Sequence, residues 1–168
     1  MPVLTGRDGT LSGMGFRKRL AIGIGSIAWM PRFLPQIVKC DGTIQKVTGD
    51  RYSLLDIADL PNITLDVPGR KSGIARRTRL LCAPDGDDWL IAGSYFGTEA
   101  MPQWVYNVRA ADTVAVFHGG RQWECVPTEL AGPERDDAWQ VLRAVWPNFD
   151  LYEQRTDRQI PVFRLRER

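Results

Sequence analysis

The chain has 168 residues, of which 43% are hydrophobic and 25% are charged. This length suggests a single domain, and this much apolar material is enough for a hydrophobic core. Lysine and arginine number 22 against 20 acidic residues, so the formal net charge is +2. So small an excess excludes a dedicated nucleic-acid binder, and any basic site must be local.

The cysteines and the single histidine limit the chemistry further. Cys40, Cys82 and Cys125 are odd in number and include no C-x-x-C pair, which argues against a disulfide framework and a zinc site. We therefore expect three free thiols, buried or half-buried, no metal ion, and a reducing, cytoplasmic compartment. His118 has no second histidine and no Gly-x-Ser-x-Gly motif to accompany it, so a hydrolase triad has no support.

An N-terminal segment, residues 1–40, differs from the rest of the chain. Its basic run 17–19 is followed by the apolar run 20–30, much of it with helical spacing. That run is too short to span a bilayer, and Pro31-Arg32-Phe33 follows it in place of a signal-peptide cleavage pattern. Three uses stay open for residues 14–39: a cover for one end of the core, a homo-oligomer interface, and peripheral membrane contact.

Strand patterns begin after residue 60. Ile63, Leu65 and Val67 alternate with polar residues and predict a half-buried strand. Residues 80–83 predict a second strand and residues 89–92 a third. Between these two, Pro84-Asp85-Gly86-Asp87 predicts a tight turn, because proline fixes φ at the first corner and glycine accepts positive φ.

Further along, short helices alternate with strands. Pro102 is expected to open a helix that extends to residue 111, and Pro133 opens another that Pro147 ends. Residues 114–118 and 121–130 predict a hairpin, with Gly119-Gly120 as its turn and His118 exposed beside it. A last strand covers residues 161–165.

About six short strands, joined mostly by hairpins, predict a mainly β domain with flanking helices over residues 41–168. An open sheet would leave two exposed edges, which closing the sheet on itself removes. We therefore expect a small antiparallel β-barrel.

The segment Gly69–Leu80, between the first two predicted strands, carries the strongest chemical signal. It holds five cations and no acid between Gly69 and Arg79. Its two glycines allow a tight backbone with exposed N–H groups, and Ser72 and Thr78 add hydroxyl donors, a set that suits a phosphate or a carboxylate. The P-loop spacing is missing, and a solvated basic hairpin is the alternative.

Several segments resemble the deazaflavin-dependent nitroreductase family, the F420H2-dependent reductases of actinobacteria, which include quinone reductases. Residues 69–80 match the family's Gly-Arg-Lys-Ser-Gly-x-x-Arg-x-Thr-x-Leu signature, and residues 92–94 match a strand end before a glycine-containing loop. Residues 102–110 resemble its Pro-x-Trp-x-x-Asn-Leu-x-Ala helix, and residues 146–162 its C-terminal signature. The co-linear resemblance implies a split antiparallel β-barrel, like that of FMN-binding proteins.

The resemblance implies an enzyme whose cofactor is coenzyme F420, an 8-hydroxy-5-deazaflavin with a phosphate-bearing acidic tail. Arg70, Lys71, Ser72 and Arg76 would hold the tail. The deazaflavin would lie against Thr78, Arg79, Leu80, Leu81, Ala92, Gly93, Ser94, Tyr95, Trp104 and Asn107. Trp146, Phe149 and Tyr152 would line the acceptor side, and Ser94 could hydrogen-bond the acceptor. The catalytic candidates for delivering the proton are Tyr152 and Ser94, with solvent as the alternative source.

The sequence departs from the family pattern at a few of these places. Arg79 stands where the family usually has proline, and Met101 where histidine is common. Val105-Tyr106 replaces a usual Tyr-His pair, and Trp146 and Phe149 replace frequent tyrosines. These changes leave the predicted phosphate site intact and bear on the choice of substrate.

The predicted reaction is hydride transfer from reduced F420 to a small organic acceptor, which is a quinone, an activated alkene or a nitro compound. The protein would position and shield the cofactor. Two alternatives stay open: a non-catalytic F420 carrier, and an FMN-dependent oxidoreductase of the same barrel type. We expect no nucleic-acid partner.

Overall fold

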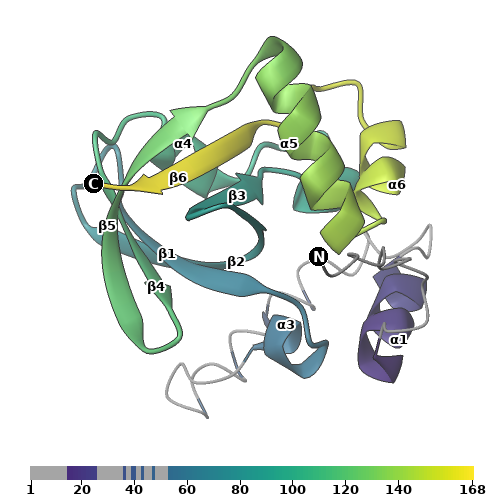
Figure 1. Cartoon of the computed structure of the whole chain (residues 1–168). Coiled ribbons are helices and arrows are strands. Elements are labelled where there is room, and N and C mark those ends of the chain that lie inside the picture. The colour runs from purple at the N-terminus through teal and green to yellow at the C-terminus, as the bar shows by residue number, and fades with distance from the viewer. Residues whose placement is uncertain (1–14, 26–35, 37–38, 41–42, 44–46, 48–52) are drawn as a thin grey trace, which may run out of the picture.

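The computed structural model describes residues 15–25, 36, 39–40, 43, 47 and 53–168. Within these residues, six antiparallel strands close into one barrel in the order β1-β2-β3-β6-β5-β4, and β4 returns to pair with β1 (Figure 1). The predicted antiparallel barrel with flanking helices is confirmed. The strands are β1 (Asn62–Pro68), β2 (Ala75–Asp85), β3 (Asp88–Ala92), β4 (Val114–His118), β5 (Arg121–Glu129) and β6 (Val162–Glu167).

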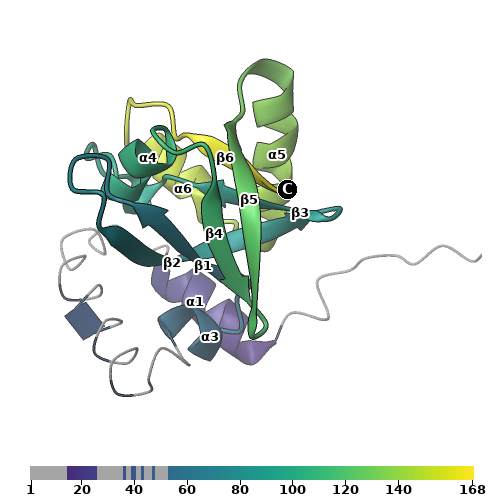
Figure 2. The same ribbon diagram turned by 90° about the vertical axis from the view of Figure 1, so that its left-hand side faces the viewer.

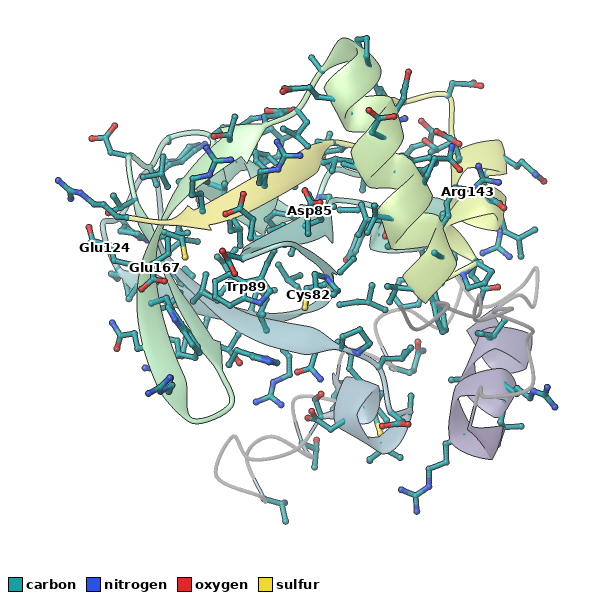
Figure 3. All side chains as sticks on the ribbon, in the orientation of Figure 1. Cys82, Asp85, Trp89, Glu124, Arg143 and Glu167 are labelled. Atoms are coloured by element: carbon teal, nitrogen blue, oxygen red, sulfur yellow. The ribbon has the colours of Figure 1, made fainter. Side chains whose placement is uncertain are left out.

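Alternation along the strands fills the barrel with apolar side chains. Ile63, Leu65 and Val67 of β1 are each 0% exposed, as their spacing predicts. They pack with Cys82 of β2 and with residues of the other strands in one cluster inside the barrel. Figure 3 shows Cys82 in this interior, well away from the N-terminal helix.

Two hairpin turns were predicted. One lies where it was predicted, and the other lies one residue further along the chain. Gly119-Gly120 joins β4 to β5 with φ of 57° and 76°, the positive values that this tight turn requires. The turn between β2 and β3 lies one residue later than predicted. Pro84 pairs with Trp89 inside the ladder, and Gly86-Asp87 forms the turn. The first-corner assignment of Pro84 is therefore wrong.

The strand β2 is also longer than predicted, because it begins at Ala75 and not near residue 80. Arg76 lies opposite Val67 and Thr78 opposite Leu65, so half of the basic segment is strand. The connecting turn spans only residues 69–74. Arg77 lies opposite Asp66 in the same register.

Helices cover parts of the barrel. The predicted helix after Pro102 is α4 (Gln103–Val108), shorter than expected, and the one at Pro133 is α5 (Gly132–Val145). Three short elements were not predicted: α3 (Leu54–Ile57), η3 (Tyr95–Gly97) and α6 (Phe149–Gln154). Helices α5 and α6 lie side by side (Figure 1), and Arg143 of α5 donates to Asp150 of α6 at 2.9 Å (Figure 3). A second apolar cluster lies beneath them.

The helix α1 (Phe16–Gly25) confirms part of the helical pattern in the N-terminal segment. Its Ala21 and Ile22 pack against the second apolar cluster, and the Asn148 amide donates to the Ile22 carbonyl at 2.8 Å. The remainder of residues 14–39 falls largely outside the described residues, and the boundary predicted at residue 40 stays a prediction. In the part of the chain that the structure describes, no helix has both the length and the apolar character to span a bilayer.

All three cysteines are free thiols. Cys82 and Cys125 are buried, as predicted, and burial raises the pKa of Cys82 to about 12 and that of Cys125 to about 11. Both thiols are therefore neutral near pH 7. Cys40 is exposed, so the expectation of burial is wrong for that residue.

Candidate functional site

The β1–β2 turn folds on its own hydrogen bonds. The Gly69 carbonyl accepts from the amides of Ser72 and Gly73, at 3.1 and 2.7 Å, and the Gly69 amide donates to the Ile74 carbonyl at 2.9 Å. The Ile74 amide donates to the Ser72 hydroxyl at 3.3 Å. The expectation of exposed N–H groups is therefore wrong for these residues, and recognition of an anion here falls mainly to side chains.

The five cations of the basic segment divide into two groups. Arg77 pairs with Asp66 at 3.0 Å, and Arg79 pairs with Asp56 at 2.5 Å. Among residues 53–168, no ion pair involves Arg70, Lys71 or Arg76. All three are exposed. Among the cations of the basic segment, those without a carboxylate partner are thus the three that the sequence assigns to the phosphate.

A pocket of about 450 Å³ joins this turn to α4. Its lining is rich in hydrogen-bond donors and contains no carboxylate: Gly69, Arg70, Lys71, Ser72, Arg76, Arg77, Thr78, Gln103, Trp104 and Asn107. Figure 2 shows α4 next to the β1–β2 turn at one end of the barrel. A concave site with several cations, hydroxyls and one aromatic ring can hold an anionic ligand that also has a planar group.

Helix α4 fixes the turn as well as lining the pocket. The Asn107 side-chain oxygen accepts from the Arg70 amide at 3.1 Å, and the Arg70 guanidinium lies 5.0 Å from the centre of the Tyr106 ring. Trp104 is 8% exposed and packs on Phe163 in the core. Gln103 was not predicted, although it lies one helical turn before Asn107, a spacing that puts both on one face.

The structure thus brings together seven of the predicted cofactor residues: Arg70, Lys71, Ser72, Arg76, Thr78, Trp104 and Asn107. The others lie outside the pocket lining. Leu80 packs against the barrel interior, whereas Leu81 and Ala92 pack against the second cluster. Gly93 is buried, Ser94 is half-buried and Tyr95 is exposed. Their roles at the deazaflavin stay predictions.

The three aromatic residues predicted for the acceptor side lie together in the second apolar cluster. Trp146, Phe149 and Tyr152 are 8%, 3% and 3% exposed. The Trp146 indole donates to the Tyr152 hydroxyl at 3.2 Å. Burial raises the pKa of Tyr152, against the opposing effects of the Trp146 hydrogen bond and of Arg155, so the phenol stays protonated near pH 7. Contact with an acceptor remains a prediction for all three.

Arg79, predicted at the cofactor, instead takes part in a network that holds α3. Its guanidinium donates to Asp56 at 2.5 Å. The same carboxylate accepts from the Asn62 amide at 2.8 Å, from the Ser53 hydroxyl at 2.9 Å and from the Ser53 backbone at 2.8 Å. Ser53 and Asp56 form the capping box of α3. The pairing with Asp56 explains how a cation is accommodated in β2 where the family usually has proline.

A closed antiparallel barrel with an acid-free basic pocket at one end is the framework of a protein that binds an anionic cofactor. Residues 41–167 match the family described as F420H(2)-dependent quinone reductase. The chain belongs to this family, and the predicted resemblance is confirmed.

Individual relatives agree with this assignment. The F420H(2)-dependent quinone reductase of Mycobacterium tuberculosis is 28% identical over 144 residues, which cover 83% of this chain and 97% of that protein. Among solved structures, an F420-H2 dependent reductase (FDR-A) is 31% identical with a TM-score of 0.59, covering 62% of this chain and 93% of the other. A structure described as a domain-swapped dimer is 28% identical with a TM-score of 0.61, covering 78% and 98%.

The Asp56 network predicts a pH-dependent contribution to stability. Burial acts to raise the pKa of Asp56, but hydrogen bonds from Asn62 and Ser53 and the charge of Arg79 outweigh it, so the pKa lies below the model-compound value of 3.8. Because the folded-state pKa is depressed, the stabilisation is present above about pH 4 and is lost as the pH falls through the folded-state pKa. Asp56→Asn should lower the free energy of unfolding by about 1–2 kcal/mol at pH 7.

Urea unfolding at pH 7 and at about pH 2.5 measures this difference. The difference in the free energy of unfolding between wild type and Asp56→Asn should be smaller at the lower pH. Asp66→Asn, which removes the exposed ion pair with Arg77, is the matched control and should cost less than about 0.5 kcal/mol. An equal difference in the free energy of unfolding at both pH values would contradict the stabilising role of the ionised Asp56 carboxylate.

Proposed function

We propose that the protein binds F420 in the pocket between the β1–β2 turn and α4, and reduces a quinone with the reduced cofactor. One observation carries the proposal: Arg70, Lys71 and Arg76 converge on a pocket that has no carboxylate in its lining. The names of the relatives, which are F420H2-dependent quinone reductases, support the choice of cofactor and acceptor.

The residues of the pocket fit a phosphate with an acidic tail. Two guanidinium groups and one ammonium offer forked and point-charge donors, and the Ser72 and Thr78 hydroxyls add neutral ones. Within residues 53–168 these three cations have no carboxylate partner, and three are more than one phosphomonoester needs, which favours a longer polyanion. Trp104 provides the one aromatic ring of the lining, against which a planar ring system could lie.

Bound reduced F420 supplies a hydride from its deazaflavin ring. The chain's own residues would bind, orient and shield it. The cations would hold the acidic tail, so that binding energy from the tail could fix the position of the ring. The hydrogen bond from the Arg70 amide to Asn107 keeps the turn and α4 at a constant separation, and Trp104 excludes water from the inner wall.

The acceptor also needs a proton, and Ser94, Tyr152 and solvent are the sources we consider. Ser94 ends β3 and is half-buried. The Tyr152 hydroxyl accepts a hydrogen bond from Trp146, which leaves its own proton available to donate. Its raised pKa is suited to a donor that stays protonated until the acceptor takes charge.

Removing the cations without partners tests the cofactor site. Lys71→Ala and Arg76→Ala should each weaken F420 binding about tenfold, and the double variant about 100-fold, because each loses a charge-assisted contact with the same polyanion. A fluorescence titration with F420 measures the affinity. Arg166→Ala removes another exposed cation, which pairs with Asp88 on the barrel wall, and it should leave the affinity unchanged.

The same titration with FMN separates this proposal from its alternatives. Wild-type protein should bind F420 more tightly than FMN, since FMN has one phosphate and no acidic tail. Tighter binding of FMN, or unaltered F420 affinity in the double variant, would refute the cofactor assignment. F420 binding without oxidation of F420H2 by any quinone would indicate a carrier.

The role of Tyr152 is tested by Tyr152→Phe. If the hydroxyl delivers the proton, turnover should fall about tenfold or more while F420 affinity stays within about twofold. Steady-state kinetics with several quinones provide the measurement. Trp146→Phe, which removes the donor to the same hydroxyl, is the control for packing. Equal losses in affinity and in turnover with every acceptor would assign Tyr152 to the core alone.

We further propose that α1 contacts the membrane surface peripherally. A lipophilic quinone dissolved in the membrane would then lie close to the protein. Arg17 and Arg19 are exposed, and Leu20 is 54% exposed beside them. Deleting residues 1–40 would also remove the packing of Ile22, so Arg17→Glu combined with Arg19→Glu is the cleaner change. The variant should sediment less with anionic lipid vesicles than wild type does. Wild-type protein that stays in the supernatant would exclude the contact.

A homo-oligomer is also proposed, because a similar structure is described as a domain-swapped dimer. Light scattering of the purified protein would measure its mass. A mass near 19.0 kDa, that of one chain, would exclude it.

A further inference from the structure

Arg158 lies between α6 and β6 and binds a segment distant in sequence. Its Nη2 donates to the Ser94 carbonyl at 2.7 Å, and its Nε donates to the Thr98 carbonyl at 2.9 Å. Its Nη1 lies 3.8 Å from the Met101 sulfur. One guanidinium therefore bonds to both ends of the turn that follows β3, residues 94–98. This turn is part of the connection between β3 and α4.

This connection has a backbone that needs external support. Tyr95 and Phe96 have positive φ, 45° and 58°, which is uncommon for residues with a side chain. Gly97 follows with φ of 74°, and a Cβ there would lie 2.5 Å from the Tyr152 carbonyl oxygen. Phe96 packs on the Tyr152 ring with centroids 5.7 Å apart. Contacts from the C-terminal part of the chain thus hold a segment that local preference disfavours.

The environment of Arg158 indicates that carbonyl binding is its main role. No ion pair within residues 53–168 involves it, although it is half-buried. Burial lowers its pKa, with Glu99 and Tyr106 opposing. A partly desolvated cation is stabilised here by oxygen and sulfur atoms of the β3–α4 connection.

The connection leads directly into the pocket wall. Pro102 follows Met101, and α4 then places Gln103, Trp104 and Asn107 in the lining. At the other end, the Gly93 amide donates to the Pro161 carbonyl at 2.9 Å, so the C-terminal segment also anchors the end of β3. The position of α4 relative to the basic turn therefore depends on how firmly residues 93–101 are held.

We propose that Arg158 is a positioning residue of the reductase site, which acts through the connection 94–101 to fix α4 against the β1–β2 turn and to orient Ser94. Arg158 does not line the pocket itself. The proposal rests on the proposed function for its kinetic consequence, but its structural consequence is measurable without cofactor.

The first experiment measures amide hydrogen exchange of the cofactor-free protein, comparing Arg158→Gln with wild type. Peptides covering residues 94–101 and 103–108 should exchange at least tenfold faster in the variant. Arg164→Gln is the matched control, because Arg164 also makes two hydrogen bonds with one guanidinium, to Asp85 on the β2–β3 hairpin. It should not accelerate exchange in these peptides. Unchanged protection of both peptides in Arg158→Gln would overturn the proposal.

The second experiment uses F420H2 and a quinone at a temperature where every variant is folded by circular dichroism. Arg158→Gln should lower kcat about tenfold or more, while F420 affinity stays within about threefold because the cations of the turn remain. Arg158→Lys keeps the positive charge but loses the forked guanidinium donors, so it should recover only part of kcat. If Arg158→Gln does not fold, Arg158→Lys alone is compared with wild type. Wild-type kcat in Arg158→Gln, full recovery by lysine, or an equal loss in Arg164→Gln would overturn the proposal.

The two experiments separate the two hypotheses. Wild-type protein that binds no F420 would refute the proposed function, while accelerated exchange in Arg158→Gln would still support the positioning of α4. Wild-type protein that binds F420, together with an Arg158→Gln variant of unchanged exchange and kcat, would refute the positioning role alone.

Discussion

The pairing of β1 with β2 is the constraint on which the site depends. Side chains alternate between the two faces of a strand, so the register decides where each cation of the basic segment points. Both Arg76 and Arg77 line the pocket, but Arg77 lies opposite Asp66 and pairs with it, whereas Arg76, one residue away, has no carboxylate partner within residues 53–168. A slip of one residue would move Arg77 away from Asp66 and so change which cation of the pocket is paired. The ladder that closes the barrel therefore also determines which charges are available to a ligand.

Leaving Arg70, Lys71 and Arg76 close together without carboxylates is unfavourable for the folded protein, because like charges repel. Exposure to solvent limits this cost. Such an arrangement makes physical sense if a polyanion neutralises the cluster, since a ligand that binds only the folded state then stabilises the fold. Hydrogen bonds within the turn occupy four of its amides, those of Gly69, Ser72, Gly73 and Ile74. Its side chains can therefore bind a ligand without a change in its backbone. The side-chain oxygen of Asn107 also fixes the turn, because it accepts a hydrogen bond from the Arg70 amide.

Much of the fold follows from local patterns in the sequence. The alternation in β1 and the Gly119-Gly120 turn both have short-range physical causes, and both were predictable. The failures arise where tertiary contacts decide. In the β1–β2 turn, most amides bond within the turn itself and the Arg70 amide bonds to a side chain 37 residues away, and Arg79 pairs with Asp56 outside the pocket lining. Positive φ at Tyr95 and Phe96 contradicts the local preference of both residues, so no pattern could have revealed η3.

The two halves of the chain contribute different things to the site. Residues 69–78 supply charge, and residues 152–161 supply position through the β3–α4 connection. Tyr152 belongs to this second set, because its ring supports Phe96 and its backbone leaves room only for glycine at position 97. The ring of Tyr152 therefore supports the connection whether or not its hydroxyl reaches an acceptor. The Trp146 hydrogen bond fixes the orientation of that hydroxyl in either case. Packing at Tyr152 is therefore a property of its ring and backbone, and only its hydroxyl could take part in chemistry.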